Sequence, residues 1–166
     1  MGHSGMRMLL LLKAPKNKDD SRRKRKRVGY GLWVPPGGGT ESFDKSQKHA
    51  AQRELLEETG LLFPLSSFRK VGILKGFLDD TGRPTWLVHL YLVMTKGLNI
   101  PIIPGEGLTK ARWFPASKLP FDRMLAGDKD WIPKIIVGDK LIVSVYSTGE
   151  TNAIKTWRIK RVKSFN

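Results

Sequence analysis

Hydrophobic and polar residues follow one another along this chain in patterns that predict a mixed α/β protein. Several segments combine apolar, β-branched and aromatic residues at strand length and are bounded by turn-forming residues. The segments predicted as strands are residues 7–13, 30–34, 71–78, 85–95, 111–115, 141–146 and 154–162. Turns are expected at residues 79–82 and 147–151, so the last two strands should form a hairpin.

The first helix is predicted at residues 44–59, between a capping residue and a glycine stop. Asp44 is the expected N-cap, with Gln47 as its capping-box partner. Gly60 is expected to end the helix in the left-handed conformation. The sequence therefore predicts a helix of about four turns.

A second helix is predicted at residues 129–137, after a turn at 126–128, and Pro133 is expected to shorten or kink it. The chain shows neither an internal repeat nor a second domain. Its 166 residues suit one domain, residues 1–166, with a core of its own. We expect an α/β sandwich in which a mixed sheet lies between two helices.

The composition is that of an ordinary globular protein, with 40% hydrophobic residues and no cysteine. The absence of cysteine excludes disulfides, a thiol nucleophile and a cysteine-based zinc site, and it suits a reducing compartment such as the cytoplasm. Residues 8–12 form the longest apolar run, which is too short to span a bilayer. Residues 1–5 resemble an expression scar and are left out of the fold prediction.

The formal net charge is +15, and much of it lies in one segment. Residues 13–27 hold nine Lys or Arg residues against two Asp residues, a net charge of +7. The basic segment, residues 16–27, is expected to be an exposed loop. Three interpretations stay open: a solvated insertion, attraction of polyphosphate or nucleic acid, and nuclear import through residues 22–27. A second cluster follows in the last strand: Lys155, Arg158, Lys160, Arg161 and Lys163.

Candidate chemistry lies in the first helix, where Glu54, Glu57 and Glu58 stand at i, i+3 and i+4. This spacing places three carboxylates on one helix face, where like charges repel one another. A hard divalent cation such as Mg²⁺, with Mn²⁺ as a substitute, would remove that repulsion and bridge the carboxylates to phosphate oxygens. A solvated acidic face is the alternative.

A loop precedes the helix and can approach a ligand closely because it is rich in glycine. It consists of the five residues Pro35-Pro36-Gly37-Gly38-Gly39. Together the loop and the helix resemble the Nudix box, G-x5-E-x7-R-E-U-x-E-E-x-G-U, where U is a large aliphatic residue. The matching positions are Gly39, Arg53, Glu54, Leu55, Glu57, Glu58, Gly60 and Leu61. On these residues the chain is identified as a member of the Nudix family.

One position departs from the pattern. The first Glu of the box is replaced by Lys45, which cannot pair with Arg53 because both are cations. In the family this Glu braces the motif, often through that arginine. Asp44, one residue earlier, is the obvious substitute. Because the three helix carboxylates are intact, we expect activity to survive with weaker metal affinity.

Further residues match in similar order beyond the box: Arg112-Trp113-Phe114, Leu119-Pro120-Phe121, Met124, Asp128, Trp131 and Pro133, with Gly149, Thr151, Arg158 and Val162 in the terminal hairpin. On these residues the chain resembles MutT-type enzymes, and within them the oxidised-purine triphosphatase subgroup of mammals. The resemblance implies that Asp128 reads the purine edge and that Trp131 lines the base pocket, although Trp131 could equally be core. A second aspartate of that subgroup is Gly127 here, a base-contacting asparagine is Val34 and a stacking tryptophan is Leu125. These losses weaken the expected preference for an oxidised base.

The resemblance implies Mg²⁺-dependent hydrolysis of a nucleoside diphosphate linked to a further group. The expected metal ligands are the three helix carboxylates, the Gly39 carbonyl and Glu106, for which a role on the loop surface is equally open. Glu54 or Glu57 would act as general base, with Arg53 in the catalytic site and Gly38 at the substrate. Alternatives are a dinucleoside or diphosphoinositol polyphosphate hydrolase, an RNA 5′-pyrophosphohydrolase, and a nucleotide- or nucleic-acid-binding module without activity. The sequence leaves the oligomeric state open.

Overall fold

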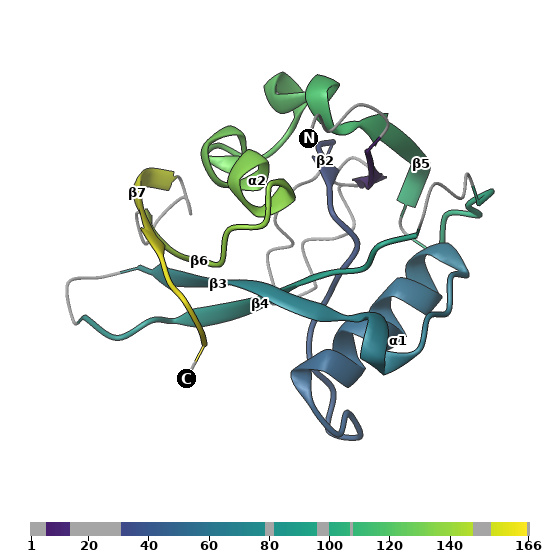
Figure 1. Cartoon of the computed structure of the whole chain (residues 1–166), viewed down its shortest axis with the longest axis horizontal. Helices are drawn as coiled ribbons and strands as arrows, with labels where there is room; N and C mark the ends of the chain where they lie inside the picture. Colours follow the sequence, from purple (N-terminus) through teal and green to yellow (C-terminus); the bar gives the residue numbers. More distant parts are fainter. Residues whose placement is uncertain are drawn as a thin grey trace, which may run out of the picture. The chain divides into compact units, whose positions relative to one another are not determined.

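The computed structural model describes residues 6–13, 31–78, 82–95, 100–106, 108–147 and 154–165 (Figure 1). The chain divides into two compact units. Unit 1 is Met1–Leu65 with Thr95–Leu125, and unit 2 is Ser66–Met94 with Ala126–Asn166. Residues 1–5, the basic segment, residues 79–81 of the first predicted turn and residues 148–151 of the second lie outside the described residues.

Unit 1 contains a three-stranded antiparallel sheet with the order β2-β1-β5. Its strands are β1 (Arg7–Lys13), β2 (Trp33–Val34) and β5 (Leu108–Pro115). β1 is the central strand, which explains its continuous apolar run: Leu10 and Leu11 have no exposed surface. Leu9 and Leu11 pack with Leu61 in the core of this unit.

Helix α1 (Gln47–Thr59) also belongs to unit 1. Short 3₁₀ helices at Leu65–Ser67, Ala116–Lys118 and Phe121–Arg123 complete the described connections. The predicted strand at residues 7–13 is confirmed. The strand predicted at 30–34 is shorter than expected, because pairing with β1 is limited to two residues.

Unit 2 contains a four-stranded mixed sheet with the order β4-β3-β6-β7. The strands are β3 (Arg69–Phe77), β4 (Trp86–Leu92), β6 (Leu141–Ser147) and β7 (Ile154–Arg161). β3 and β6 run parallel, and the other neighbouring pairs are antiparallel. The predicted terminal hairpin is therefore confirmed as the β6–β7 pair.

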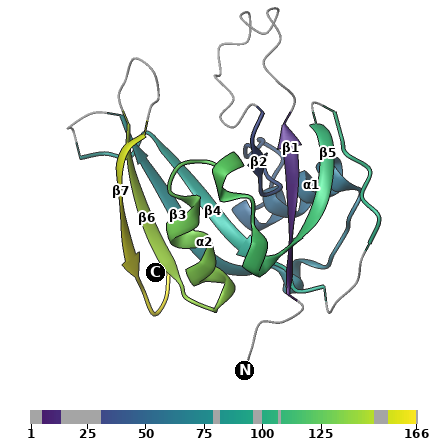
Figure 2. The same ribbon diagram turned by 90° about the horizontal axis from the view of Figure 1, so that it is seen from above.

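Helix α2 (Asp128–Ile136) lies against the mixed sheet on its β6 side, as both views show (Figures 1 and 2). Gly72 of β3 makes room for it, since a Cβ there would lie 3.3 Å from Cδ1 of Ile135. The helix continues through Pro133 for three more residues. The α/β composition was predicted correctly, whereas the strands form two sheets rather than the single mixed sheet expected.

In the part of the chain that the structure describes, no helix combines the length and the apolar character needed to cross a membrane.

Candidate active site

The start of α1 differs from the sequence prediction, and the difference shapes the site. Ser46, rather than Asp44, is the N-cap: its Oγ accepts the backbone N–H of His49 at 3.1 Å. Both residues are good cap formers, but the Asp44 carboxylate is engaged elsewhere. The end of the helix is as predicted, with Gly60 at φ 71° and its N–H donating to the Leu56 carbonyl at 2.8 Å.

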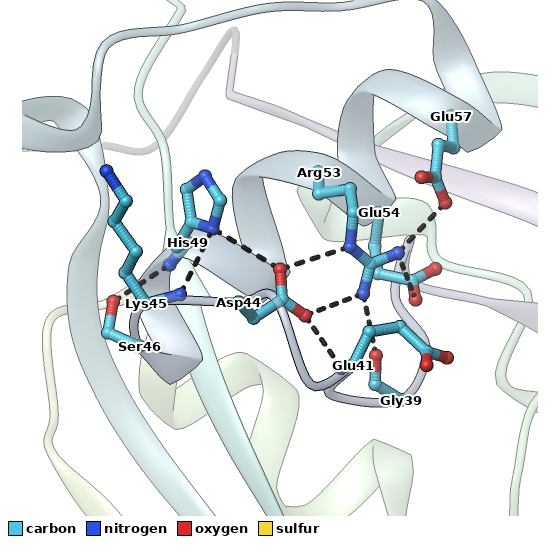
Figure 3. A network of polar contacts seen from close by, with 9 residues as sticks. All are labelled: Gly39, Glu41, Asp44, Lys45, Ser46, His49, Arg53, Glu54 and Glu57. Carbon is cyan, nitrogen blue, oxygen red and sulfur yellow. Dashed lines mark hydrogen bonds and ion pairs between the residues drawn. The ribbon is translucent and has the colours of Figure 1, made fainter.

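Arg53 holds the loop that precedes the helix (Figure 3). Its Nε donates to Asp44 Oδ1 at 3.1 Å and its Nη2 to Asp44 Oδ2 at 3.0 Å, a bidentate pair. Nη2 also donates to the Gly39 carbonyl at 2.8 Å. The predicted substitution of Asp44 for the missing glutamate of the box is thus seen directly as an ion pair.

The same guanidinium contacts two carboxylates of the helix. Nη1 of Arg53 donates to Glu54 Oε1 and to Glu57 Oε2, both at 3.0 Å. Together with the loop contacts this makes five hydrogen bonds, which matches the five N–H donors of a guanidinium. Arg53 therefore ties the glycine loop, Asp44 and the carboxylate face into one network.

The Asp44 carboxylate is completely enclosed, with no exposed side-chain surface. Hydrogen bonds from Arg53 and from the backbone N–H of Glu41 hold its pKa at about 2, below the ordinary 3.8. The same pairing raises the pKa of Arg53. Both groups are therefore charged at neutral pH.

Lys45 lies outside this network, and its side chain points away from Arg53 (Figure 3). It is exposed, and its backbone N–H lies 3.4 Å from His49 Nδ1. The same Nδ1 is 3.3 Å from Asp44 Oδ1. A neutral His49 can accept the N–H, whereas a protonated one can pair with Asp44. Sequence reasoning missed His49, whose position after Asp44 matches no pattern of the box.

The glycine loop lies directly against the carboxylates. The Gly37 N–H donates to Glu58 Oε2 at 2.7 Å. A Cβ on Gly38 would lie 2.4 Å from the carboxyl atoms of Glu54, so any larger residue would push the two apart. The loop therefore packs closely against the glutamates of α1, whereas its approach to a ligand stays a prediction.

The segment that carries Glu106 passes the C-terminal end of α1. Gly105 donates its N–H to the Glu58 carbonyl at 3.0 Å, and a Cβ on Gly105 would lie 2.5 Å from the Glu57 carbonyl oxygen. Glu106, the next residue, is exposed. Among the described residues, no group of three acidic or histidine side chains is arranged to hold a metal.

The donor set nevertheless fits a hard cation, because it consists of carboxylate oxygens on one helix face beside a glycine loop. In this structure two of those carboxylates turn toward the positive charge of Arg53. Glu57 is 57% exposed at its side chain, compared with 15% for Glu54. A cation would therefore reach Glu57 from solvent without opening the protein.

Asp128 and Trp131 belong to unit 2, where both are buried on α2. Gly127 precedes them at φ 93°, and a Cβ there would lie 3.1 Å from the Trp157 ring. An aspartate at this position would be strained and would crowd Trp157. The position therefore favours glycine in this fold. Contact of Asp128 or Trp131 with a base stays a prediction.

Comparison with known proteins decides the family. The NUDIX domain model matches residues 7–135. The chain belongs to the Nudix hydrolase family. This confirms that the protein belongs to an enzyme family and that the motif was recognised correctly as a Nudix box, whereas the roles of its single residues stay predictions. Nudix hydrolases generally use a divalent metal.

Two curated relatives of this Nudix chain are both named oxidized purine nucleoside triphosphate hydrolase. The one from Danio rerio is 31% identical over 115 residues, which cover 68% of each chain. The one from Mus musculus is 24% identical over 142 residues, which cover 86% of each chain. They confirm the resemblance to the oxidised-purine subgroup.

Solved structures confirm the predicted fold class. A MutT protein from Bacillus halodurans has a TM-score of 0.56 at 21% identity, covering 93% of this chain and 90% of its own. A bifunctional NMN adenylyltransferase/ADP ribose pyrophosphatase from Francisella tularensis, complexed with AMP and a Mn ion, has a TM-score of 0.57 at 20% identity. That match covers 80% of this chain and 38% of the other. At such identities these likenesses show the fold alone.

Proposed function

We propose that this chain acts as one Mg²⁺-dependent domain that hydrolyses purine nucleoside triphosphates to the monophosphate and pyrophosphate. Oxidised purines such as 8-oxo-dGTP are its preferred substrates, consistent with the names of both curated relatives. The observation that carries the proposal is the five-bond network of Arg53. It preserves the architecture of the box although the usual glutamate is absent.

Glu54, Glu57 and Glu58 would hold the cation, with Glu106 as a further carboxylate beside the end of α1. The Gly39 carbonyl is less suited than the sequence suggests, because it already accepts an N–H of Arg53 and lies next to that positive charge. When bound, Mg²⁺ neutralises phosphate charge and lowers the pKa of an attacking water.

The protein residues have three tasks in this scheme. Arg53 orients Glu54 and Glu57, either of which can take the proton of the attacking water. The glycine loop, with Gly38 lying against Glu54, brings the backbone close enough for phosphate oxygens to approach. Water adds to phosphorus as the bond to pyrophosphate breaks, so positioning and charge account for most of the catalysis.

Base selection would depend on Asp128, whose carboxyl group would face the purine edge, and on Trp131 in the pocket wall. Because Val34 and Gly127 supply no side-chain hydrogen bonds, the preference for an oxidised base should be modest. A Nudix fold that only binds its ligand is less consistent with the structure. Asp44 pairs with Arg53 in place of the glutamate that Lys45 replaces, so the contact is kept.

A substrate panel tests the proposal. It comprises 8-oxo-dGTP, dGTP, a diadenosine polyphosphate, a diphosphoinositol phosphate and triphosphorylated RNA, each with Mg²⁺, with Mn²⁺ and with a chelator. We expect cleavage of the purine triphosphates, with a higher kcat/KM for 8-oxo-dGTP. Asp128→Ala should lose that preference, and Asp130→Ala on the same helix should keep it. Equal kcat/KM values for the two guanine nucleotides would refute the oxidised-base role.

The metal site is tested separately through Glu57→Gln and Glu58→Gln, which keep the side-chain shape but remove a charged ligand. Turnover should fall by more than about tenfold in both, because even outer-shell changes commonly cost 10–100-fold. Glu41→Gln is the matched control, since the exposed Glu41 contributes its backbone to the network (Figure 3). A Mn²⁺ titration should likewise show weaker metal binding in Glu57→Gln and Glu58→Gln and unchanged binding in Glu41→Gln.

A further inference from the structure

The mixed sheet of unit 2 has two faces of different character. The first face packs against α2: a Cβ on Gly72 would meet Ile135, and one on Gly127 would meet Trp157. Leu141 and Val143 of the same face are 1% exposed. α2 is the one α-helix that the described residues of unit 2 contain, and it lies on this side.

The second face follows from the register, because side chains alternate along each strand. Ile73, Lys75 and Phe77 of β3 point opposite to Gly72, and their partners on the neighbouring strands share that side. The second face therefore includes Lys75, Phe77, His89, Tyr146, Arg158 and Lys160. Each of these side chains is exposed or half-buried.

Three strands contribute to one stack on this face. The rings of Phe77 and Tyr146 are 5.0 Å apart at their centroids and inclined by 17°. The guanidinium of Arg158 lies 5.6 Å from the centre of the Tyr146 ring. The register explains the stack. Phe77 of β3 pairs with Tyr146 of β6, and Arg158 of β7 lies diagonal to Tyr146 because it pairs with Ser144, two residues earlier.

The charge of the second face is positive. Lys75 and Arg158 flank Ser144 on one rung, and Lys160 lies two residues beyond Arg158, about 7 Å along the strand. The described residues assigned to this face include no Asp or Glu. Burial, with a smaller effect of Lys70, lowers the pKa of His89, so this histidine adds no charge at neutral pH.

We propose that the second face binds single-stranded nucleic acid, with unpaired bases against the Phe77–Tyr146 stack and phosphates at Lys75, Arg158 and Lys160. Aromatic rings beside cations on a flat surface are the combination that sequence-tolerant single-strand binding requires. An acidic peptide would engage the cations but leave the rings unused. The proposal does not depend on the hydrolytic activity, because none of these residues belongs to the carboxylate site.

Fluorescence anisotropy with a labelled 12-residue oligothymidylate at low salt tests this inference in the full chain. The matched pair is Lys160→Ala on the second face and Lys134→Ala on α2, since each removes one exposed positive charge. Lys160→Ala and Arg158→Ala should weaken binding several-fold, and each should lower the salt slope by about 0.7. Lys134→Ala should change neither quantity. All variants keep the basic segment, whose contribution therefore cancels.

The aromatic part is tested with Phe77→Leu, which keeps an apolar side chain, and Tyr146→Phe, which keeps the ring. Phe77→Leu should weaken binding by roughly fivefold or more. Fivefold corresponds to the lower end of the free energy that stacking of one base on an aromatic ring contributes. Tyr146→Phe should bind normally, and circular dichroism checks that both variants are folded. Hydrolysis of a small nucleotide should be unchanged in all of them.

Three results would overturn the proposal. The first is equal weakening by Lys134→Ala and Lys160→Ala, which would show attraction by net charge alone. The second is equal affinity for a duplex of the same length. The third is competition by polyglutamate as strong as that by the oligonucleotide, which would identify an acidic protein segment as the better ligand.

Discussion

The two helices of this protein are held in place by different kinds of interaction. α1 has thirteen residues, of which Ala50 and Thr59 are buried. Leu55 packs on the core of unit 1, and the caps and the hydrogen bonds of Arg53 hold the polar side of the helix. α2 has nine residues, of which four are buried, and it is held by apolar packing on the mixed sheet. A helix that presents carboxylates to a ligand leaves that face open to solvent, so polar contacts rather than packing orient the groups on it.

This comparison separates two ways of damaging the protein. A change in the Arg53 network should act mainly on the chemistry, because the network orients the groups that would bind the cation. A change under α2 should act mainly on stability, because it removes buried apolar surface.

The largest effect is expected from Ile132→Ala in α2, where Ile132 is 1% exposed. The variant should lose about 2–5 kcal/mol of unfolding free energy through lost burial and a cavity. Urea denaturation measures the loss, and Mn²⁺ titration of the folded variant should give an unchanged affinity. Ile103→Ala is the control, since Ile103 is 81% exposed and should stay within about 0.5 kcal/mol. Loss of metal affinity in Ile132→Ala would refute the separation.

Arg53→Lys should have the next largest effect, and here activity rather than stability should be lost. A lysine ammonium cannot reproduce five donors in a planar fork, so Glu54 and Glu57 lose their orientation. We expect kcat/KM to fall by about 10–100-fold, as for other residues that orient metal ligands. The exposed Arg69→Lys serves as the control. Activity within twofold of the unmodified protein would mean that the carboxylates need no such support.

The Asp44–Arg53 pair predicts an acid dependence of stability. The pKa of Asp44 is depressed from 3.8 to about 2, so its charged form is favoured in the folded state. Its contribution is fully present above pH 3.8 and is lost as the pH falls through about 2. The difference in unfolding free energy between the unmodified protein and Asp44→Asn should therefore shrink over that range. A difference that is independent of pH would show that the pair contributes nothing through charge.

Ser46→Ala should cost about 1 kcal/mol, the usual value of a lost N-cap hydrogen bond. Thermal or urea unfolding measures it, with the exposed Ser42→Ala as the control. No loss would point to a second cap at the start of α1.

The smallest effect is expected from Lys45→Glu, although the motif alone would suggest an improvement. All five N–H donors of Arg53 already have acceptors, two of them on Asp44, so a glutamate at position 45 finds no donor left there. Stability should change by less than about 0.5 kcal/mol, and Mn²⁺ affinity should be unchanged. A clear gain in either quantity would show that Asp44 fills the position incompletely.

Local patterns along the chain predicted several elements well. The strand at residues 7–13, the end of α1 at Gly60 and the hairpin of β6 and β7 depend on apolar runs and turn residues that lie close together in sequence. The predicted start of α1 was wrong because Asp44 and Ser46 are both good N-cap residues. The choice between them depends on Arg53, nine residues after Asp44, which takes the carboxylate.

By itself, the sequence determined the family, the α/β class and the three glutamates on one helix face, because each follows from residue type and short-range spacing. Only the tertiary structure decided how these parts are joined. The parallel pairing of β3 with β6 connects segments far apart in the chain, where Gly72 makes room for Ile135. Likewise, the five donors of Arg53 find their acceptors across a folded loop, since a guanidinium binds where acceptors converge in space.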